Sequence, residues 1–294
     1  MKIVIAGASG LIGKALSKHL KTKGHEITPL SRKEGKFHWN PEKEEVDLSL
    51  LEEKDVIINV SGENISSGRW TANKKERILS SRLNASTLLR QAIKKLNHPP
   101  KVFINASAIG FYGSTGDLVV DEETPPGEDF LADVCKQWEA AVFPVEKLPV
   151  RIVIPRIGMV VSRDGGVLEK VKLPFSLGLG GVIGSGQQYM SWIDLQDVCQ
   201  IFEFLIQTET LFGPVNLVSP NPVTNREWTE SLGKILHRPT FFSIPETLAK
   251  IVFGEMADSL LLSSTKVYPK ALLDSGYVFS RPLLEDSLKA QLTD

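Results

Sequence analysis

The sequence has little of what marks a secreted, metal-bound or nucleic-acid-binding protein. Its 294 residues include only two cysteines, Cys135 and Cys199, and neither has a second cysteine at metal or redox spacing. The five histidines are scattered, and no Gly-x-Ser-x-Gly motif of serine hydrolases occurs. The 34 Lys and Arg residues balance 35 Asp and Glu residues, so no net positive charge attracts a polyanion. These absences disfavour metalloenzyme, hydrolase and nucleic-acid-binding functions.

Long hydrophobic runs are also missing. The apolar stretch at the N-terminus covers only residues 3–6, whereas a secretory signal needs about 7–15 residues. The longest uncharged run, residues 173–193, is long enough to cross a membrane but contains Pro174 and five glycines. We therefore expect a cytoplasmic, reduced protein with no membrane partner.

What the chain does contain is a regular alternation of short apolar runs with helical patterns. Each apolar run is continuous, which is typical of strands that are covered on both faces. The runs are Ile3–Ile5, Val56–Ile58, Val102–Ile104, Val150–Ile154 and Val215–Val218. The pattern predicts an α/β fold with a doubly wound parallel (Rossmann) sheet.

The intervening segments show the spacing of amphipathic helices. Helices are expected after residue 11 up to Gly24, over 71–96, over about 131–145, and from Asp194 onward. Beyond Pro222 the alternation fades. Thr224 and Glu227 form a capping-box pattern for a helix to about His237, and further helices are expected over 244–253 and 283–292. We expect residues 1–165, with 187–218 returning to them, to form the sheet domain, and residues 166–186 and 219–294 to form a smaller substrate-side lobe.

A glycine-rich turn follows the first apolar run directly. Gly7 permits a tight turn, Gly10 lets backbone N–H groups approach a pyrophosphate, and Gly13 lets the next helix pack close to the strand. The phosphate-loop motif of nucleotide triphosphatases does not fit, because it needs Gly at position 8 and Ser or Thr at position 15, where the chain has alanines. The position of the turn predicts dinucleotide binding.

The second expected strand, residues 26–30, ends in Ser31 and Arg32, where an NAD-binding protein carries an acidic residue. Arginine with a serine hydroxyl suits a 2′-phosphate, which favours NADP over NAD. The alternative is that Arg32 is a solvated surface cation. Pro29 is unexpected in an inner strand, because it removes a ladder hydrogen bond.

Several longer motifs resemble a known family. They are Gly62-Glu63-Asn64-Ile65 with Arg69-Trp70, the stretch from Ala106 to Gly113, Val134-Cys135-Lys136 with Trp138-Glu139, and Gly184-Ser185-Gly186-Gln187 with Ser191-Trp192-Ile193. Together they resemble the extended short-chain dehydrogenase/reductases and, more narrowly, an atypical branch named the nucleoside-diphosphate-sugar epimerase-like family. The resemblance covers essentially the whole chain.

The resemblance implies a set of cofactor-binding residues, each with a role. The glycines would face the pyrophosphate, and the second strand would end at the 2′-phosphate. The segment after the fourth strand would face the ribose and adenine, Arg82 the cofactor phosphates, and Val160 the nicotinamide end. The implied residues are Gly7, Gly10, Gly13, Ser31, Arg32, Val60, Ser61, Arg82 and Val160. For Arg82 the alternative is an arginine at the edge of the core that reaches water.

The catalytic pattern of short-chain dehydrogenases is incomplete. They place a tyrosine four residues before a lysine that lowers its pKa, but the residue four before Lys136 is Ala132. The resemblance leaves Ser107, Tyr112 and Lys136 as catalytic candidates. Tyr112 could instead be an aromatic lid, Ser107 a strand-end hydroxyl that satisfies backbone, and Lys136 a solvated lysine.

Two functions remain open from the sequence. The first is an NADP-dependent oxidoreductase or epimerase-like enzyme that acts on a small carbonyl, hydroxyl or nucleotide-sugar substrate. In it, Ser107 would polarise the carbonyl and Tyr112 or water would relay the proton. The second is a non-catalytic NADPH-binding or sensing protein. Extended relatives are often dimers, so a homodimer is also left open.

Overall fold

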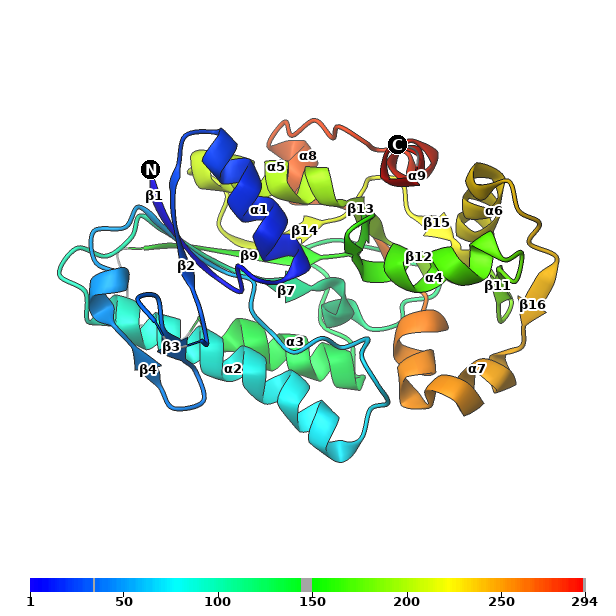
Figure 1. Cartoon of the computed structure of the whole chain (residues 1–294), viewed down its shortest axis with the longest axis horizontal. Coiled ribbons are helices and arrows are strands. Elements are labelled where there is room, and N and C mark those ends of the chain that lie inside the picture. The colour runs from blue at the N-terminus through cyan, green and yellow to red at the C-terminus, as the bar shows by residue number, and fades with distance from the viewer. Residues whose placement is uncertain (34, 144–149, 293–294) are drawn as a thin grey trace.

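The computed structural model describes residues 1–33, 35–143 and 150–292. A parallel sheet of seven strands lies at its centre (Figure 1), in the order β14-β9-β6-β5-β1-β2, with β7 pairing β9. The strands are β1 (Lys2–Ala6), β2 (Glu26–Leu30), β5 (Val56–Asn59), β6 (Val102–Asn105), β7 (Ser107–Ala108), β9 (Arg151–Ile157) and β14 (Gly213–Leu217). All these pairings are parallel, which confirms the predicted sheet.

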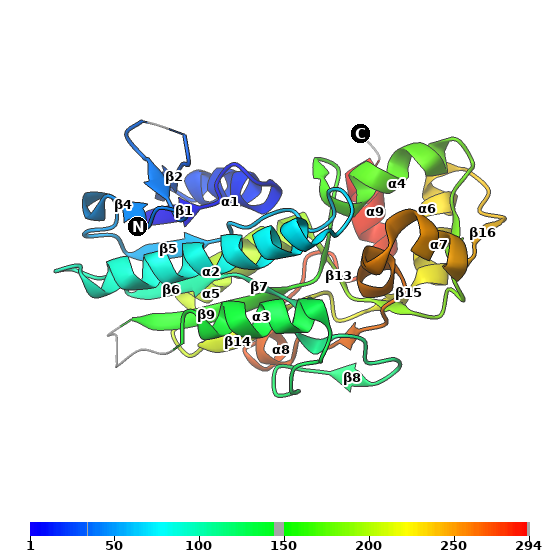
Figure 2. The same cartoon turned by 90° about the horizontal axis from the view of Figure 1, so that it is seen from below.

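Helices lie above and below the sheet in Figure 1, and Figure 2 looks onto the lower face. On one face lie α1 (Leu11–Thr22) and α5 (Leu195–Gln207), and on the other lie α2 (Ala72–Lys94) and α3 (Phe130–Ala140). The two faces of β1 show why. Ile3 and Ile5 pack with α1 and α5, whereas Val4 packs with α2. Continuous apolar strands therefore feed two separate cores. Helix α3 ends before the expected boundary, Val145, which lies outside the described residues.

The position of Pro29 is explained by the sheet order. β2 is an edge strand that pairs only with β1, where Pro29 lies opposite Ile5. An edge strand has one side without a ladder partner, so a residue that lacks an N–H is tolerated there. The expectation of an inner strand was wrong, because among the described residues no strand pairs with the outer side of β2. The chain instead forms the small hairpin of β3 (Trp39–Asn40) and β4 (Glu45–Val46), followed by η1 (Leu48–Leu50).

The smaller part of the molecule lies beyond one end of the sheet (Figure 1). It is built from short helices and two-stranded pairings: β10 with β13, β11 with β16, and β12 with β15. Its elements are β10 (Met159–Ser162), α4 (Gly166–Ser176), β11 (Gly181–Ile183), β12 (Tyr189–Met190), β13 (Trp192–Asp194), β15 (Val223–Thr224), α6 (Asn225–Leu236), β16 (Phe242–Ile244), α7 (Glu246–Phe253), η3 (Ala257–Leu261) and α9 (Leu284–Leu292). The capping box of Thr224 and Glu227 is present at the start of α6, as predicted.

One part of the expected C-terminal lobe packs on the sheet domain instead. β17 (Lys266–Val267) pairs with β8 (Val119–Val120), and α8 (Lys270–Asp274) lies against β14. Leu272 and Phe279 belong to the core that contains α1 and α5. We therefore propose a division in which the lobe consists of residues 159–194, 219–265 and 282–292.

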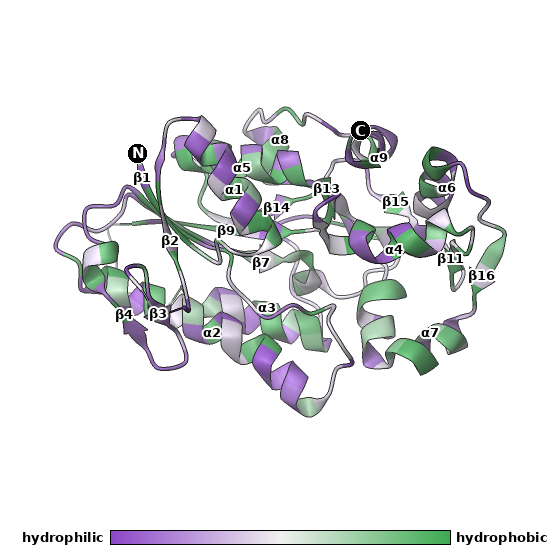
Figure 3. Cartoon of the chain, in the orientation of Figure 1, coloured by the Kyte–Doolittle hydropathy of each residue, from purple (hydrophilic) through white to green (hydrophobic). Residues whose placement is uncertain are grey.

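Hydropathy follows this architecture. Figure 3 shows the inner strands mainly apolar, whereas the long helix α2 is strongly mixed. In the described part of the chain, no helix is both long and apolar enough to cross a membrane.

Candidate functional site

The glycine turn lies at the carboxyl end of β1, where the strand order changes direction between β1 and β5. Gly7 has a φ of +85°, and a Cβ there would lie 2.7 Å from the Ser61 nitrogen. A Cβ on Gly13 would lie 2.1 Å from the Gly7 oxygen. Both glycines are therefore required by the fold itself.

Gly10 differs from the other two because the space beside it is open. Its nearest neighbour, the Gly7 oxygen, would lie 3.4 Å from an added Cβ, and the residue is exposed. Gly10 is also the N-cap of α1, with no side-chain cap and no acidic residue in the first turn. The start of α1 therefore presents backbone N–H groups and the positive end of a helix to solvent, which suits a pyrophosphate.

The end of β2 lies beside this turn. Ser31 is half-buried, and its hydroxyl accepts a hydrogen bond from the Lys33 N–H at 3.1 Å. Arg32 is exposed and makes no hydrogen bond or ion pair to another described residue. Its guanidinium is thus available to an anionic ligand.

The segment after β5 packs under the glycine turn. The Val60 N–H donates to the Ala6 carbonyl at 3.0 Å, and the Ser61 hydroxyl donates to Asn59 Oδ1 at 2.5 Å. Asn59 is fully buried and donates to Asn105 Oδ1 at 2.7 Å. These bonds join the carboxyl ends of three neighbouring strands and fix Val60 and Ser61 next to Gly7.

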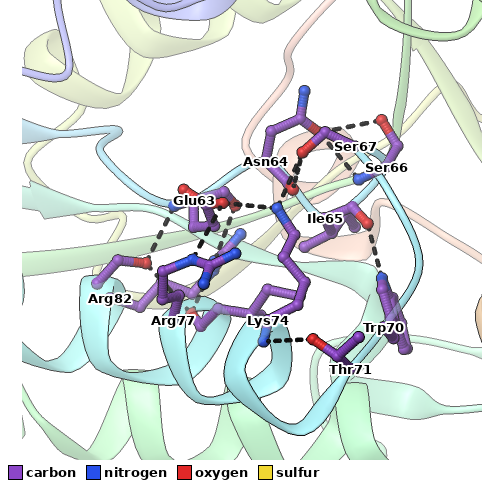
Figure 4. A network of polar contacts seen from close by, with 12 residues as sticks. Glu63, Asn64, Ile65, Ser66, Ser67, Trp70, Thr71, Lys74, Arg77 and Arg82 are labelled. Atoms are coloured by element: carbon purple, nitrogen blue, oxygen red, sulfur yellow. Dashed lines mark hydrogen bonds and ion pairs between the residues drawn. The ribbon is translucent and has the colours of Figure 1, made fainter.

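Glu63 is the centre of a polar network between this segment and α2 (Figure 4). Lys74 Nζ donates to Glu63 Oε1 at 2.6 Å and to Ser67 Oγ at 2.9 Å, and Arg77 Nε lies 3.8 Å from Glu63 Oε1. The hydrogen bond from Lys74 is the main cause that keeps the Glu63 pKa below its usual value, with smaller contributions from Arg77 and Arg32. The surroundings of this carboxylate are strongly positive.

Arg82 lies beneath the same segment. Its Nη1 donates to the Glu63 carbonyl at 3.2 Å and to the Ile78 carbonyl at 2.9 Å, and its guanidinium lies 5.0 Å from the Trp138 ring. A Cβ on Gly62 would lie 3.2 Å from Arg82 Cζ. Burial lowers the pKa of this guanidinium. The structure thus brings Arg82 to the segment that follows Ser61.

Val160 reaches the glycine turn through its neighbours. It lies half-buried in β10. The turn that follows β10 approaches Leu11 at the start of α1, because a Cβ on Gly165 would lie 3.3 Å from Leu11 Cδ1. All nine residues implied to bind cofactor therefore lie on β1–α1 or on adjoining segments.

The three catalytic candidates do not come together in this way. Ser107, Arg156 and Asn216 form a row across β7, β9 and β14. The Ser107 hydroxyl donates to Glu139 Oε1 at 2.7 Å, and Arg156 forms two hydrogen bonds of 2.9 Å with the same carboxylate. The carboxylate also binds the Arg156 guanidinium and acts as the acceptor in both contacts, so the serine hydroxyl is the donor. Ser107 is buried, so its hydroxyl is used within the protein.

Tyr112 is at the other end of this row. Its hydroxyl donates to Asn216 Oδ1 at 2.7 Å and accepts from Arg156 Nη1 at 2.9 Å. The side chain is buried, and burial raises the pKa of Tyr112 to about 12. Neither a proton relay nor an exposed aromatic lid is favoured by this geometry. It favours a structural role.

Lys136 lies on the outer face of α3. It is exposed, and Ala132, four residues earlier, is fully buried. The α3 side chains that face the 107–110 segment are Leu131 and Cys135, whose Cβ and Sγ atoms would lie 3.2 and 3.8 Å from a Cβ on Gly110. Burial raises the Cys135 pKa to about 12. The two α3 residues beside the strand end, four positions apart, are therefore the apolar Leu131 and the thiol Cys135. Each lies one position before the Ala132 and Lys136 pair that the sequence motif indicates.

Glu139 and Arg156 are two of the buried charged residues to which sequence reasoning gave no role. Arg156 stands in an apolar strand, and a charge in that position requires a buried partner. That is the signal by which the pair could have been found. In the described part of the chain, no group of three or more His, Cys, Asp or Glu residues could hold a metal.

The sheet order, the glycine turn and the open helix N-terminus define a dinucleotide-binding protein with the architecture of short-chain dehydrogenase/reductases. The chain belongs to the NAD dependent epimerase/dehydratase family, whose model matches residues 3–217. A domain of unknown function, DUF1731, matches residues 244–291.

Full-length relatives confirm this assignment. An epimerase family protein of Mycobacterium leprae is 38% identical over 99% of this chain and 95% of its own length. The human epimerase family protein SDR39U1 is 36% identical over 98% of this chain and 99% of its own. A crystal structure of human SDR39U1 with NADPH aligns with a TM-score of 0.92 at 34% identity, covering 99% of both chains. The UDP-glucuronic acid 4-epimerase of Bacillus cereus shares the fold, with a TM-score of 0.77 at 17% identity.

Proposed function

We propose that the chain is an NADPH-binding protein whose described residues place no readily ionised acid or base beside Ser107, and that it acts as a non-catalytic NADPH-binding or sensing protein. The observation that carries the second half of this proposal is the face of α3 beside Ser107. Leu131 and Cys135 occupy it, Tyr112 is buried with both its hydrogen bonds made, and Lys136 is exposed.

Several features support NADPH as the ligand. The open N-terminus of α1 would hold the pyrophosphate at Gly10, between the closely packed Gly7 and Gly13. Ser31 and Arg32 would hold the 2′-phosphate, and Val60, Ser61, Arg82 and Val160 would line the rest of the site. Hydride donation by bound NADPH would belong only to the second candidate function, described next. Human SDR39U1, which is similar along its whole length, was crystallised with NADPH.

A second candidate function is an NADP-dependent oxidoreductase or epimerase-like enzyme acting on a small carbonyl, hydroxyl or nucleotide-sugar substrate. Membership of the epimerase/dehydratase family favours it. Water would then have to supply the proton, because burial raises the pKa of Cys135 and of Tyr112 to about 12, and Lys136 is exposed. Loss of a positioned acid or base typically lowers a rate by about 10²–10⁴-fold.

Single-turnover oxidation of bound NADPH separates the two candidates. The protein, loaded with one equivalent of NADPH, is mixed with a panel of carbonyl compounds and nucleotide sugars, and nicotinamide absorbance is followed for an hour. We expect no loss of absorbance beyond that of protein-free NADPH. A short-chain dehydrogenase with an intact tyrosine and lysine is the positive control. Stoichiometric oxidation by any member of the panel would reject the non-catalytic assignment in favour of the second candidate.

A further inference from the structure

The segment 62–71 connects β5 to α2 without regular secondary structure, and both sides of it are anchored. On the side of α2, the Glu63 N–H donates to Ser81 Oγ at 3.0 Å, and Lys74 binds the Glu63 and Ser67 side chains (Figure 4). Trp70 Nε1 closes the segment on itself by donating to the Ile65 carbonyl at 2.7 Å. The shape of the segment is therefore fixed by its own contacts with α2.

On its other side the segment holds the start of the DUF1731 region. Arg69 Nη2 donates to the carbonyls of Ile251 and Val252 at 2.5 and 3.1 Å, and Arg69 Nε donates to Val252 at 3.2 Å. Both carbonyls belong to the last turn of α7, where a helix has unsatisfied acceptors and a negative end. An arginine of the sheet domain thus caps a helix of the C-terminal lobe.

Two further contacts join the same regions. Lys170 of α4 donates to the Ser66 carbonyl, and Lys75 at the start of α2 pairs with Glu255 at 2.7 Å, just after α7. Lys75 also lies 4.3 Å from the Phe130 ring at the start of α3. Segment 62–71 and the first turn of α2 are therefore one of the attachments between the lobe and the sheet domain.

The first residues of the segment also belong to the coenzyme site. Gly62 follows Ser61, which packs on Gly7, and it lies directly against the guanidinium of Arg82. The Glu63 carbonyl accepts from the same guanidinium. An anionic ligand could draw Arg82 toward its phosphates or fix the backbone at residues 60–62. Either change would alter the position of segment 62–71, whose far end caps α7.

α7 itself is held weakly enough to respond. Ala249 is its only buried residue, whereas Ile251 is 71% exposed and Leu248 is 48% exposed. Figure 3 shows the helix as largely apolar. A short helix with few buried contacts opens at low free energy, so a change in its C-terminal cap alters how often it opens.

We propose that segment 62–71 couples the coenzyme site to α7, so that bound NADPH stabilises the capped position of α7 through Arg69. This inference rests on the proposed binding of NADPH and adds a readout for it. Coupling between two sites is reciprocal, so loss of the Arg69 cap on α7 is expected to lower the affinity for NADPH.

The test is hydrogen exchange of residues 246–261 in the full-length protein, with and without NADPH, together with calorimetric titration of NADPH. In the wild type we expect NADPH to slow exchange in α7 at least fivefold, the lower end of typical allosteric coupling. In Arg69→Ala we expect this difference to disappear and NADPH to bind about fivefold more weakly, by the same reciprocity.

The matched control is Arg238→Ala. Arg238 also donates to a helix-terminal carbonyl, that of Ser176 at the end of α4, at 2.7 Å, but both partners lie within the lobe. We expect Arg238→Ala to keep both the effect of NADPH on α7 and the affinity. If NADPH binds the wild type and leaves α7 exchange unchanged, the coupling is refuted and the proposed function stands. If NADPH does not bind, both are refuted.

Discussion

Replacing Glu139 by alanine is expected to lower the free energy of unfolding by about 3–5 kcal/mol, the range measured when one partner of a buried ion pair is removed. Glu139 and Arg156 are 7% and 4% exposed. Without the carboxylate, the buried guanidinium keeps its charge and loses two hydrogen bonds, and the Ser107 hydroxyl loses its acceptor. Urea unfolding followed by circular dichroism measures the change.

The control for this substitution is Glu285→Ala. Glu285 pairs with Lys234 at 3.1 Å, but both side chains are well exposed, so its loss is expected to cost less than about 1 kcal/mol. A second variant tests the cause directly. Glu139→Leu combined with Arg156→Met removes both charges and should recover a large part of the stability. If Glu139→Ala costs no more than Glu285→Ala, the buried pair does not hold β7, β9 and α3 together as described.

Replacing Arg32 by alanine is expected to weaken NADPH binding about 10–100-fold, which corresponds to the loss of charge-assisted hydrogen bonds worth about 1.5–3 kcal/mol. NADH lacks the 2′-phosphate, so its affinity should change less than twofold. Arg32 is exposed at the end of β2, and its substitution should leave the fold intact. Titration calorimetry with both coenzymes measures the two affinities.

The neighbouring residue provides the control. Lys33 is an exposed cation in the same bend, so Lys33→Ala removes an equal charge without removing the proposed contact. A nonspecific effect of local charge is screened by salt and would be similar for both variants. Equal losses of NADPH and NADH affinity in Arg32→Ala would contradict the assignment of the phosphate site.

Much of the fold could be predicted because its signals are local. The continuous apolar runs identified five strands of the sheet, and Thr224 with Glu227 identified the start of α6. The order of strands carries no local signal. For this reason the tolerance of Pro29 became clear only when β2 was seen at the edge of the sheet.

The part of the candidate site that depends on backbone geometry could be predicted from the sequence. The part that depends on which α3 side chains face the sheet could be predicted much less well. The roles expected of Gly7 and Gly13 follow from the space that a side chain would occupy. On α3, by contrast, a shift of one residue turns a side chain by about 100°, which separates the buried Cys135 from the exposed Lys136. The pairing of Glu139 with Arg156 depends on packing between a helix and a strand, which a single sequence does not specify.

The central claim is that the uncapped N-terminus of α1 and the arginine after β2 together bind the phosphorylated coenzyme. Calorimetric titration of the purified wild-type protein with NADPH and with NADH tests it most directly. We expect NADPH to bind at least about tenfold more tightly than NADH, because only NADPH offers Arg32 a charged partner. Binding of neither coenzyme, or tighter binding of NADH, would contradict the account.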